Sequence, residues 1–188
     1  VHADYPPYEV LRTPALSYEA LFALHRIAEL VDALHNSGRF AMTLERFVPA
    51  FASPFTFFET AAEHFGARRY FDSPQPPQRA YELLASLSRD MGGAVPEDAV
   101  AYDWCRRGEG GAWPRGVPEP AAADAAALRA FLSGAENIRR FLPHCEGNPV
   151  RRFERRCRAY AFPRLFPAPG WVLFDAGQKG FAQRIEMP

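Results

Sequence analysis

The histidines and cysteines of this chain are the residues best suited to bind a metal ion. His144 and Cys145 are adjacent, and Cys157 follows twelve residues later. A zinc site normally needs three or four ligands, which a sequence reveals through short spacings such as C-x-x-C. No such spacing occurs here. We therefore interpret His144 as a loop histidine beside a half-buried thiol, and predict no metal-binding residues in the chain.

Side chains for acid–base or nucleophilic catalysis are not grouped either. The sequence contains no H-E-x-x-H, no glycine-rich phosphate loop and no recognisable Ser/His/Asp set. Glu82 and Asp103 are isolated acids on different expected helices, and helix capping or a salt bridge explains them equally well. We predict neither catalytic nor cofactor-binding residues.

The one concentration of basic residues lies near the C-terminal quarter. If residues 150–157 are helical, four arginines share a stripe with i,i+4 spacing. Such a stripe could bind nucleic acid or a phosphate-bearing partner, but a solvated face or pairing with acids of the same molecule is the preferred interpretation. The four residues of this possible interface are Arg151, Arg152, Arg155 and Arg156.

A second possible interface is the lead-in Tyr5, Pro6, Pro7 and Tyr8. Each proline fixes its own φ and pushes the preceding residue into extended geometry, so this segment cannot be helical. Because prolines make a semi-rigid spacer, we expect the lead-in to dock against a neighbouring domain and orient it. The alternative is that both tyrosines fold back onto the first helix.

Helical periodicity dominates the chain up to about residue 142. From Tyr18 to His35 the apolar stripe is wide, which predicts a helix packed on more than one side. Ser17 is a good N-cap for it, and Gly38 a natural left-handed residue after its end. Ser53 followed by Pro54 predicts the start of another helix. Further helices are expected at about 40–51, 77–91, from Pro96 onward, 121–132 and 136–142.

After residue 149 the pattern changes from helical spacing to alternation. Residues 158–162 and 181–187 alternate, 171–174 form a short apolar run, and 175–180 have turn chemistry. We predict a single domain, 1–188, with an extended lead-in (1–16), a helical body (17–145), and a short helix plus a small β hairpin (148–188). The expected fold class is mainly α, a multi-helix orthogonal bundle with a small C-terminal antiparallel β element.

Composition limits the classes of partner. Hydrophobic residues make up 48% and charged residues 23%, which is ordinary for a globular domain. The 22 basic and 22 acidic residues cancel, so the chain lacks the field expected of a dedicated nucleic-acid binder. No apolar run approaches the roughly 20 residues of a membrane span. Three cysteines form no disulfide framework, and a cytoplasmic location is expected.

Several short motifs, in order along the chain, resemble a known family. They are Tyr5-Pro6-Pro7-Tyr8-Glu9, Leu16-Ser17-Tyr18-Glu19, Asn36-Ser37-Gly38-Arg39-Phe40, Ser53-Pro54-Phe55, Phe57-Phe58-Glu59, Tyr81-Glu82-Leu83-Leu84, Tyr102-Asp103 and Asn137-Ile138-Arg139-Arg140-Phe141-Leu142-Pro143. From Tyr5 to about Phe174, the chain resembles a domain of unknown function found at the C-terminus of cobalamin-binding radical-SAM proteins.

The resemblance implies an accessory domain, without catalytic machinery of its own, that caps or positions a catalytic domain. The parent enzyme would use cobalamin, a 4Fe-4S iron–sulfur cluster and S-adenosylmethionine, and its upstream domains would be the partners of this one. The radical-SAM cluster needs C-x-x-x-C-x-x-C, which this chain lacks, so no cofactor is expected within it. The alternative is a free-standing helical interaction module that binds a protein or nucleic acid.

Overall fold

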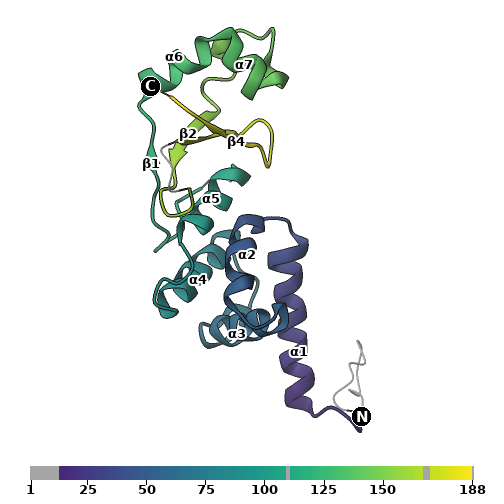
Figure 1. Ribbon diagram of the computed structural model, residues 1–188. Helices are drawn as coiled ribbons and strands as arrows, with labels where there is room; N and C mark the ends of the chain where they lie inside the picture. The colour runs from purple at the N-terminus through teal and green to yellow at the C-terminus, as the bar shows by residue number, and fades with distance from the viewer. Residues whose placement is uncertain (1–12, 109–110, 167–169, 188) are drawn as a thin grey trace.

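The computed structural model describes residues 13–108, 111–166 and 170–187 (Figure 1). The lead-in Tyr5, Pro6, Pro7 and Tyr8 lies outside the described residues, so its docking stays a prediction. Within the described part, seven α-helices are accompanied by a small four-stranded antiparallel sheet towards the C-terminus. The expected mainly α fold with a small β element is confirmed.

The first helix begins and ends as its sequence predicts. Helix α1 (Tyr18–Leu30) starts after Ser17, whose Oγ accepts a hydrogen bond from Ala20 N at 3.2 Å. It continues into a π-helical turn, η1 (Val31–Asn36). Gly38 then takes a left-handed φ of 64°, a conformation that glycine adopts without steric cost.

The next helices are joined by short turns and held by specific caps. Pro54 is the first residue of α3, and Ser53 Oγ accepts from Thr56 N at 3.1 Å. Asp103, fully buried, accepts hydrogen bonds from the first turn of α2. No helix of the described part is both long and apolar enough to cross a bilayer. The elements are α2 (Ala41–Phe47), η2 (Val48–Ala50), α3 (Pro54–Ala67), η3 (Tyr70–Asp72), α4 (Pro77–Asp90) and α5 (Asp98–Arg107).

The C-terminal part combines two short helices with a sheet in the order β1-β2-β3-β4, each strand antiparallel to its neighbour. Its register pairs Cys157 with Asp175 and Trp171 with Ile185. The elements are β1 (Ala121–Ala122), α6 (Ala125–Ser133), α7 (Ala135–Phe141), η4 (Pro143–Cys145), η5 (Val150–Arg152), β2 (Cys157–Ala161), β3 (Trp171–Asp175) and β4 (Ala182–Ile185).

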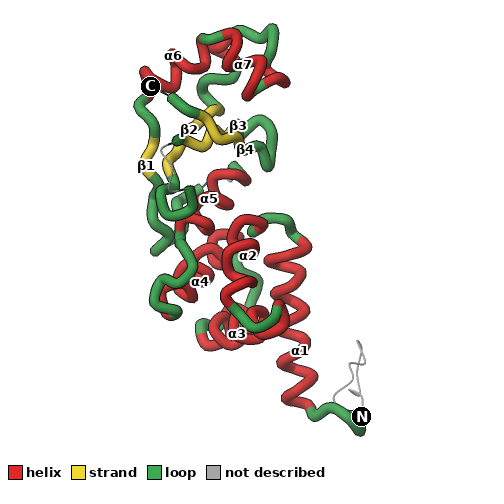
Figure 2. The backbone as a smooth tube through the Cα atoms, in the orientation of Figure 1, coloured by secondary structure: helices red, strands yellow, loops and turns green. Residues whose placement is uncertain are grey.

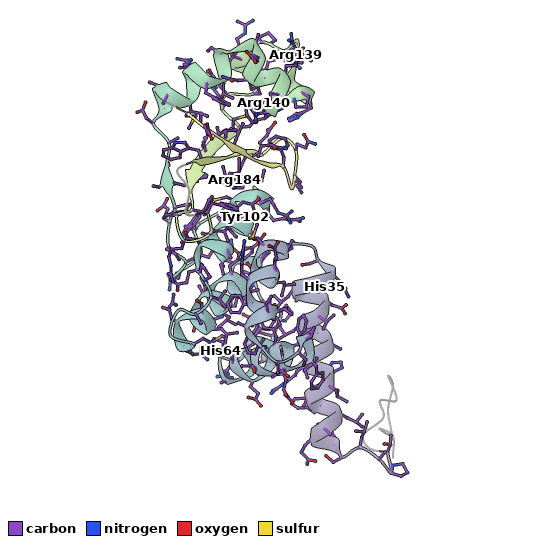
Figure 3. All side chains as sticks on the ribbon, in the orientation of Figure 1. His35, His64, Tyr102, Arg139, Arg140 and Arg184 are labelled. Atoms are coloured by element: carbon purple, nitrogen blue, oxygen red, sulfur yellow. The ribbon has the colours of Figure 1, made fainter. Side chains whose placement is uncertain are left out.

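The sheet lies between the helical body and the α6–α7 pair, and separates two hydrophobic cores (Figure 2). Alternate side chains of β3 point to opposite faces. Val172 and Phe174 therefore join the core of the helical body, whereas Leu173 joins the core beneath α6 and α7. Tyr102 of α5 packs edge-on against Phe174, at 5.5 Å between ring centroids, where the body meets the sheet (Figure 3).

Two predicted elements differ from the structure. The helix expected at 121–132 begins only at Ala125, because Asp124 caps it and residues 121–122 pair with β2 instead. The short helix expected after residue 148 is a single 3₁₀ turn, Val150–Arg152, before the chain turns into β2. The predicted hairpin is part of a larger, four-stranded sheet.

Candidate functional site

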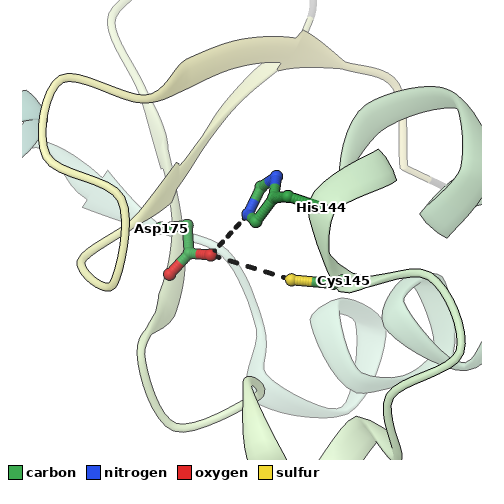
Figure 4. A group of neighbouring side chains, drawn as sticks. All are labelled: His144, Cys145 and Asp175. Carbon is green, nitrogen blue, oxygen red and sulfur yellow. Dashed lines mark hydrogen bonds and ion pairs between the residues drawn. The ribbon is translucent and has the colours of Figure 1, made fainter.

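The structure brings three potential metal ligands together at one end of the sheet. His144 Nε2 lies 2.8 Å from Asp175 Oδ2, and Cys145 Sγ lies 3.8 Å from the same oxygen (Figure 4). One ligand atom from each of the three residues lies within 4.8 Å of the others. Cys145 and Asp175 are buried, whereas the His144 side chain is partly exposed.

The second oxygen of Asp175 is held separately. Arg156 Nε lies 2.8 Å from Oδ1, and the backbone N–H of Gly177 donates to the same oxygen at 2.8 Å. Arg156 Nη2 also lies 3.5 Å from Cys145 Sγ. The carboxylate is therefore divided between two sets of partners: Arg156 and Gly177 on one oxygen, His144 and Cys145 on the other.

Three separate segments position this cluster. His144 and Cys145 belong to η4, the 3₁₀ turn that follows α7 and opens with a proline. Asp175 is the last residue of β3, and Arg156 immediately precedes β2. The Ala176 N–H donates to Arg156 O at 3.1 Å, which extends the β2–β3 pairing to the residues that carry the charged groups.

The electrostatics favour an ionised Asp175 and protonated thiols. Burial tends to raise the pKa of Asp175, but hydrogen bonds from His144 and Gly177 and the charge of Arg156 outweigh it, so the pKa is lowered. Burial raises the pKa of Cys145, although Arg156 opposes the effect, and burial raises the pKa of Cys157 to about 12. A thiol with a raised pKa is a poor nucleophile, so Cys145 is not poised for covalent catalysis.

Sequence reasoning named three of these residues, Arg156 only as part of a possible interface, and missed Asp175. It singled out His144 and Cys145, and interpreted them as a loop histidine beside a half-buried thiol. In the structure His144 is partly exposed in a turn, as expected, but Cys145 is fully buried. Asp175 follows Cys145 by thirty residues and was assigned only to turn chemistry. No short spacing links Asp175 to Cys145: the β2–β3 pairing places Asp175 opposite Cys157, and the packing of η4 brings Cys145 to it.

The predicted arginine stripe is wrong. Val150–Arg152 is a 3₁₀ turn, and the chain enters β2 at residue 157, so no α-helix aligns the four side chains. Arg156 contacts the cluster, and Arg152 and Arg155 line different surface pockets. A role at an interface stays a prediction for the four residues, Arg151, Arg152, Arg155 and Arg156.

The two acids considered as catalytic candidates have structural partners. Glu82 pairs with Arg79, Oε2 to Nη1 at 3.1 Å, and accepts a hydrogen bond from Arg115 N at 3.1 Å. Asp103 accepts from Met42 N and Thr43 N at the start of α2. A salt bridge therefore accounts for Glu82, and helix capping accounts for Asp103.

A second feature of functional interest is the exposed start of α1. Leu16, Tyr18, Phe22 and Leu24 are 38–53% exposed, and the Tyr18 and Phe22 rings stack with centroids 6.1 Å apart. In Figure 1 this end of α1 extends away from the rest of the helical body. The expectation that the helix packs on more than one side is therefore wrong for its first half.

The motifs of the chain match one family over most of its length. Residues 1–166 match the family described as "Protein of unknown function (DUF4080)". The chain belongs to this family. The match includes His144, Cys145 and Arg156, whereas Asp175 lies beyond it. No curated protein and no solved structure matches the chain.

Proposed function

We propose that this DUF4080 chain is an accessory domain, without catalytic machinery of its own, that packs against the catalytic part of a cobalamin-dependent radical-SAM enzyme. The observation that carries the proposal is the exposed apolar start of α1. By the resemblance of its motifs, cobalamin-binding and radical-SAM domains would precede this domain in the same polypeptide. Cobalamin, the iron–sulfur cluster and S-adenosylmethionine would be bound by those domains.

The start of α1 has the properties of a contact surface. A helix that is apolar on most sides is normally buried, and contiguous exposed apolar patches commonly mark interaction sites. Burial of one large apolar side chain contributes roughly 1.5–3 kcal/mol. Tyr18 and Phe22 lie one turn apart on the same side of α1 and their rings stack, so covering these two together would stabilise a domain contact. Leu24 lies about 200° around the helix from Phe22.

The position of the surface favours a preceding domain as its occupant. The exposed residues are at the N-terminal end of the first described helix, and the proline-containing lead-in is the segment before them. A domain that precedes the lead-in would therefore reach this end of the molecule first. A helical cap held there could shield radical intermediates from solvent, as closing elements do in other enzymes.

Hydrogen exchange in the full-length protein tests the proposal. We expect the amides of residues 18–24 to be protected in the wild type and to exchange faster in Phe22→Asp, because the charge would disrupt the contact. His25→Asp is the matched control, since it places the same charge on an exposed neighbouring position of α1. If these amides exchange equally fast in the wild type and in Phe22→Asp, the contact does not exist. That outcome would favour the alternative, a free-standing helical interaction module.

A further inference from the structure

We propose that His144, Cys145 and Asp175 form a binding site for a divalent cation of the zinc class. The proposal is independent of the accessory-domain function, because it rests on the cluster at the sheet and not on α1. The spacing of the cysteines in the sequence does not indicate a metal site; only the folded structure brings these three residues together.

The donor atoms select the class of metal. The cluster offers an imidazole nitrogen, a thiol sulfur and a carboxylate oxygen. Zinc binds all three kinds of ligand, whereas magnesium and calcium require oxygen ligands. A three-ligand site also leaves one position of a tetrahedral ion for water.

The distances are close to those that a tetrahedral ion needs. Ion–ligand distances of about 2.0–2.3 Å require ligand atoms roughly 3.2–3.6 Å apart. Cys145 Sγ and Asp175 Oδ2 are separated by 3.8 Å, and His144 Nε2 and Oδ2 by 2.8 Å. The histidine would therefore have to move outward by about half an ångström. Its side chain is 28% exposed and belongs to a short turn, and its ring packs against Phe181 at 5.1 Å between centroids, so the movement would adjust that contact.

The neighbouring groups form the outer shell that metal ligands normally have. Outer-shell hydrogen bonds fix the orientation of ligand side chains. Here Arg156 and the Gly177 N–H hold Asp175 Oδ1, which leaves Oδ2 directed at the other two ligands. Arg156 Nη2 also lies 3.5 Å from Cys145 Sγ, where its charge opposes, without overcoming, the rise in pKa that burial imposes on the thiol. The ion itself must displace the thiol proton.

Of the three ligands, His144 is partly exposed and Cys145 borders a surface pocket. Cys145 and Arg156 line a surface pocket of about 360 Å³, together with Asn148, Arg152 and Phe153. On binding, Cys145 releases its thiol proton to solvent and His144 presents Nε2 without a proton. The ion therefore replaces protons at these two atoms, and its affinity should increase with pH.

Cobalt(II) titration of the purified 188-residue chain tests the site. Cobalt is the probe because a tetrahedral Co²⁺–thiolate site absorbs visible light, whereas zinc does not. We expect one Co²⁺ per chain, a sulfur-to-cobalt absorption band, and displacement by Zn²⁺ but not by Mg²⁺. Cys145→Ser should abolish the band, and Arg156→Met should weaken binding roughly tenfold to a hundredfold, the usual effect of losing an outer-shell partner.

Two further variants make the result decisive. Cys105→Ser removes a thiol outside the cluster and should leave the band unchanged. His144→Gln replaces a partly exposed side chain, so it should retain the native circular dichroism and bind Co²⁺ at least tenfold more weakly. The proposal is overturned if the wild type gives no thiolate band. It is equally overturned if Cys145→Ser and Cys105→Ser behave alike, or if His144→Gln binds with unchanged affinity.

Discussion

Asp103 makes a buried contact whose energetics can be tested by replacing it with asparagine. The carboxylate has no exposed surface and accepts hydrogen bonds from Thr43 N at 2.7 Å and Met42 N at 3.2 Å. The N-cap residue of α2, Phe40, makes no side-chain bond to the helix, so Asp103 of α5 takes that role. Compared with the ionised carboxylate, the amide of Asp103→Asn retains one acceptor oxygen for two donors. An unsatisfied buried donor costs about 1–3 kcal/mol of unfolding free energy.

The charge of Asp103 acts in the opposite direction. Burial raises the pKa of Asp103 to about 6, although hydrogen bonds from Thr43 and Met42 and the charge of Arg106 oppose it. In an unfolded chain the pKa of aspartate is about 3.9. Between these values the folded protein holds the proton more tightly than the unfolded chain does. Its unfolding free energy therefore decreases as pH rises from about 4 to about 6, by about 3 kcal/mol in total.

The asparagine variant lacks this titration, so its stability relative to the wild type must change with pH. Near pH 4 the wild-type carboxyl is protonated and, like the amide of Asp103→Asn, presents one carbonyl oxygen, so we expect the two proteins to be similarly stable there. By pH 7 the variant should gain about 3 kcal/mol of unfolding free energy relative to the wild type. Urea-induced unfolding, followed by far-ultraviolet circular dichroism at several pH values, measures the difference. Glu59→Gln makes the same chemical change on the exposed side of α3 and controls for the loss of one carboxylate. A difference between Asp103→Asn and wild type that stays constant with pH would refute the reasoning.

Two further substitutions test local contacts. Asp124 Oδ1 accepts from two backbone N–H groups in the first turn of α6, at 2.9 and 3.0 Å, so Asp124→Ala should cost about 1 kcal/mol of unfolding free energy. Asp124→Asn should largely preserve stability, and an equal loss in both variants would contradict the capping role. In Gly177→Ala the new Cβ would lie 2.7 Å from Arg156 Cζ, so the flexible, 41% exposed arginine must shift away from Asp175, and we expect a loss of at most about 1 kcal/mol in urea unfolding. The double variant Gly177→Ala/Arg156→Ala should lose less unfolding free energy than the two single variants lose in total, because the shortened side chain no longer meets the new Cβ. If the losses are strictly additive, the steric conflict is absent.

Local signals in the sequence predicted most of the secondary structure. The Ser53-Pro54 pair predicted the start of α3, and the structure confirms both the serine cap and the proline at the first helical position. The change from helical spacing to alternation predicted the C-terminal strands. These signals succeed because capping and side-chain alternation depend on residues only a few positions apart. The exceptions are residues 121–124, which precede α6 and do not belong to it, and the short helix expected after residue 148, which is a single 3₁₀ turn.

The exposed surface of α1 could not be deduced from its own sequence. A wide apolar stripe shows that a helix has much apolar surface to bury, but it does not say what covers it. In the described part of the molecule the neighbouring elements fully bury Leu30 at the end of α1 and Leu34 in η1, but leave Tyr18 and Phe22 exposed. The sequence therefore determined the amphipathic character of α1, and the tertiary arrangement decided which half remains available for a partner.

The candidate cation site depends on tertiary structure more than the exposed surface of α1 does. The sequence determined that His144 and Cys145 are adjacent, and that a strand ends near Asp175. Only the β2–β3 register, which places Cys157 opposite Asp175, brings that carboxylate and Arg156 to the same end of the sheet as Cys145. Strand register follows from which side chains the two cores bury, and those cores are built by helices distant in sequence. For this reason the cluster exists only in the folded chain.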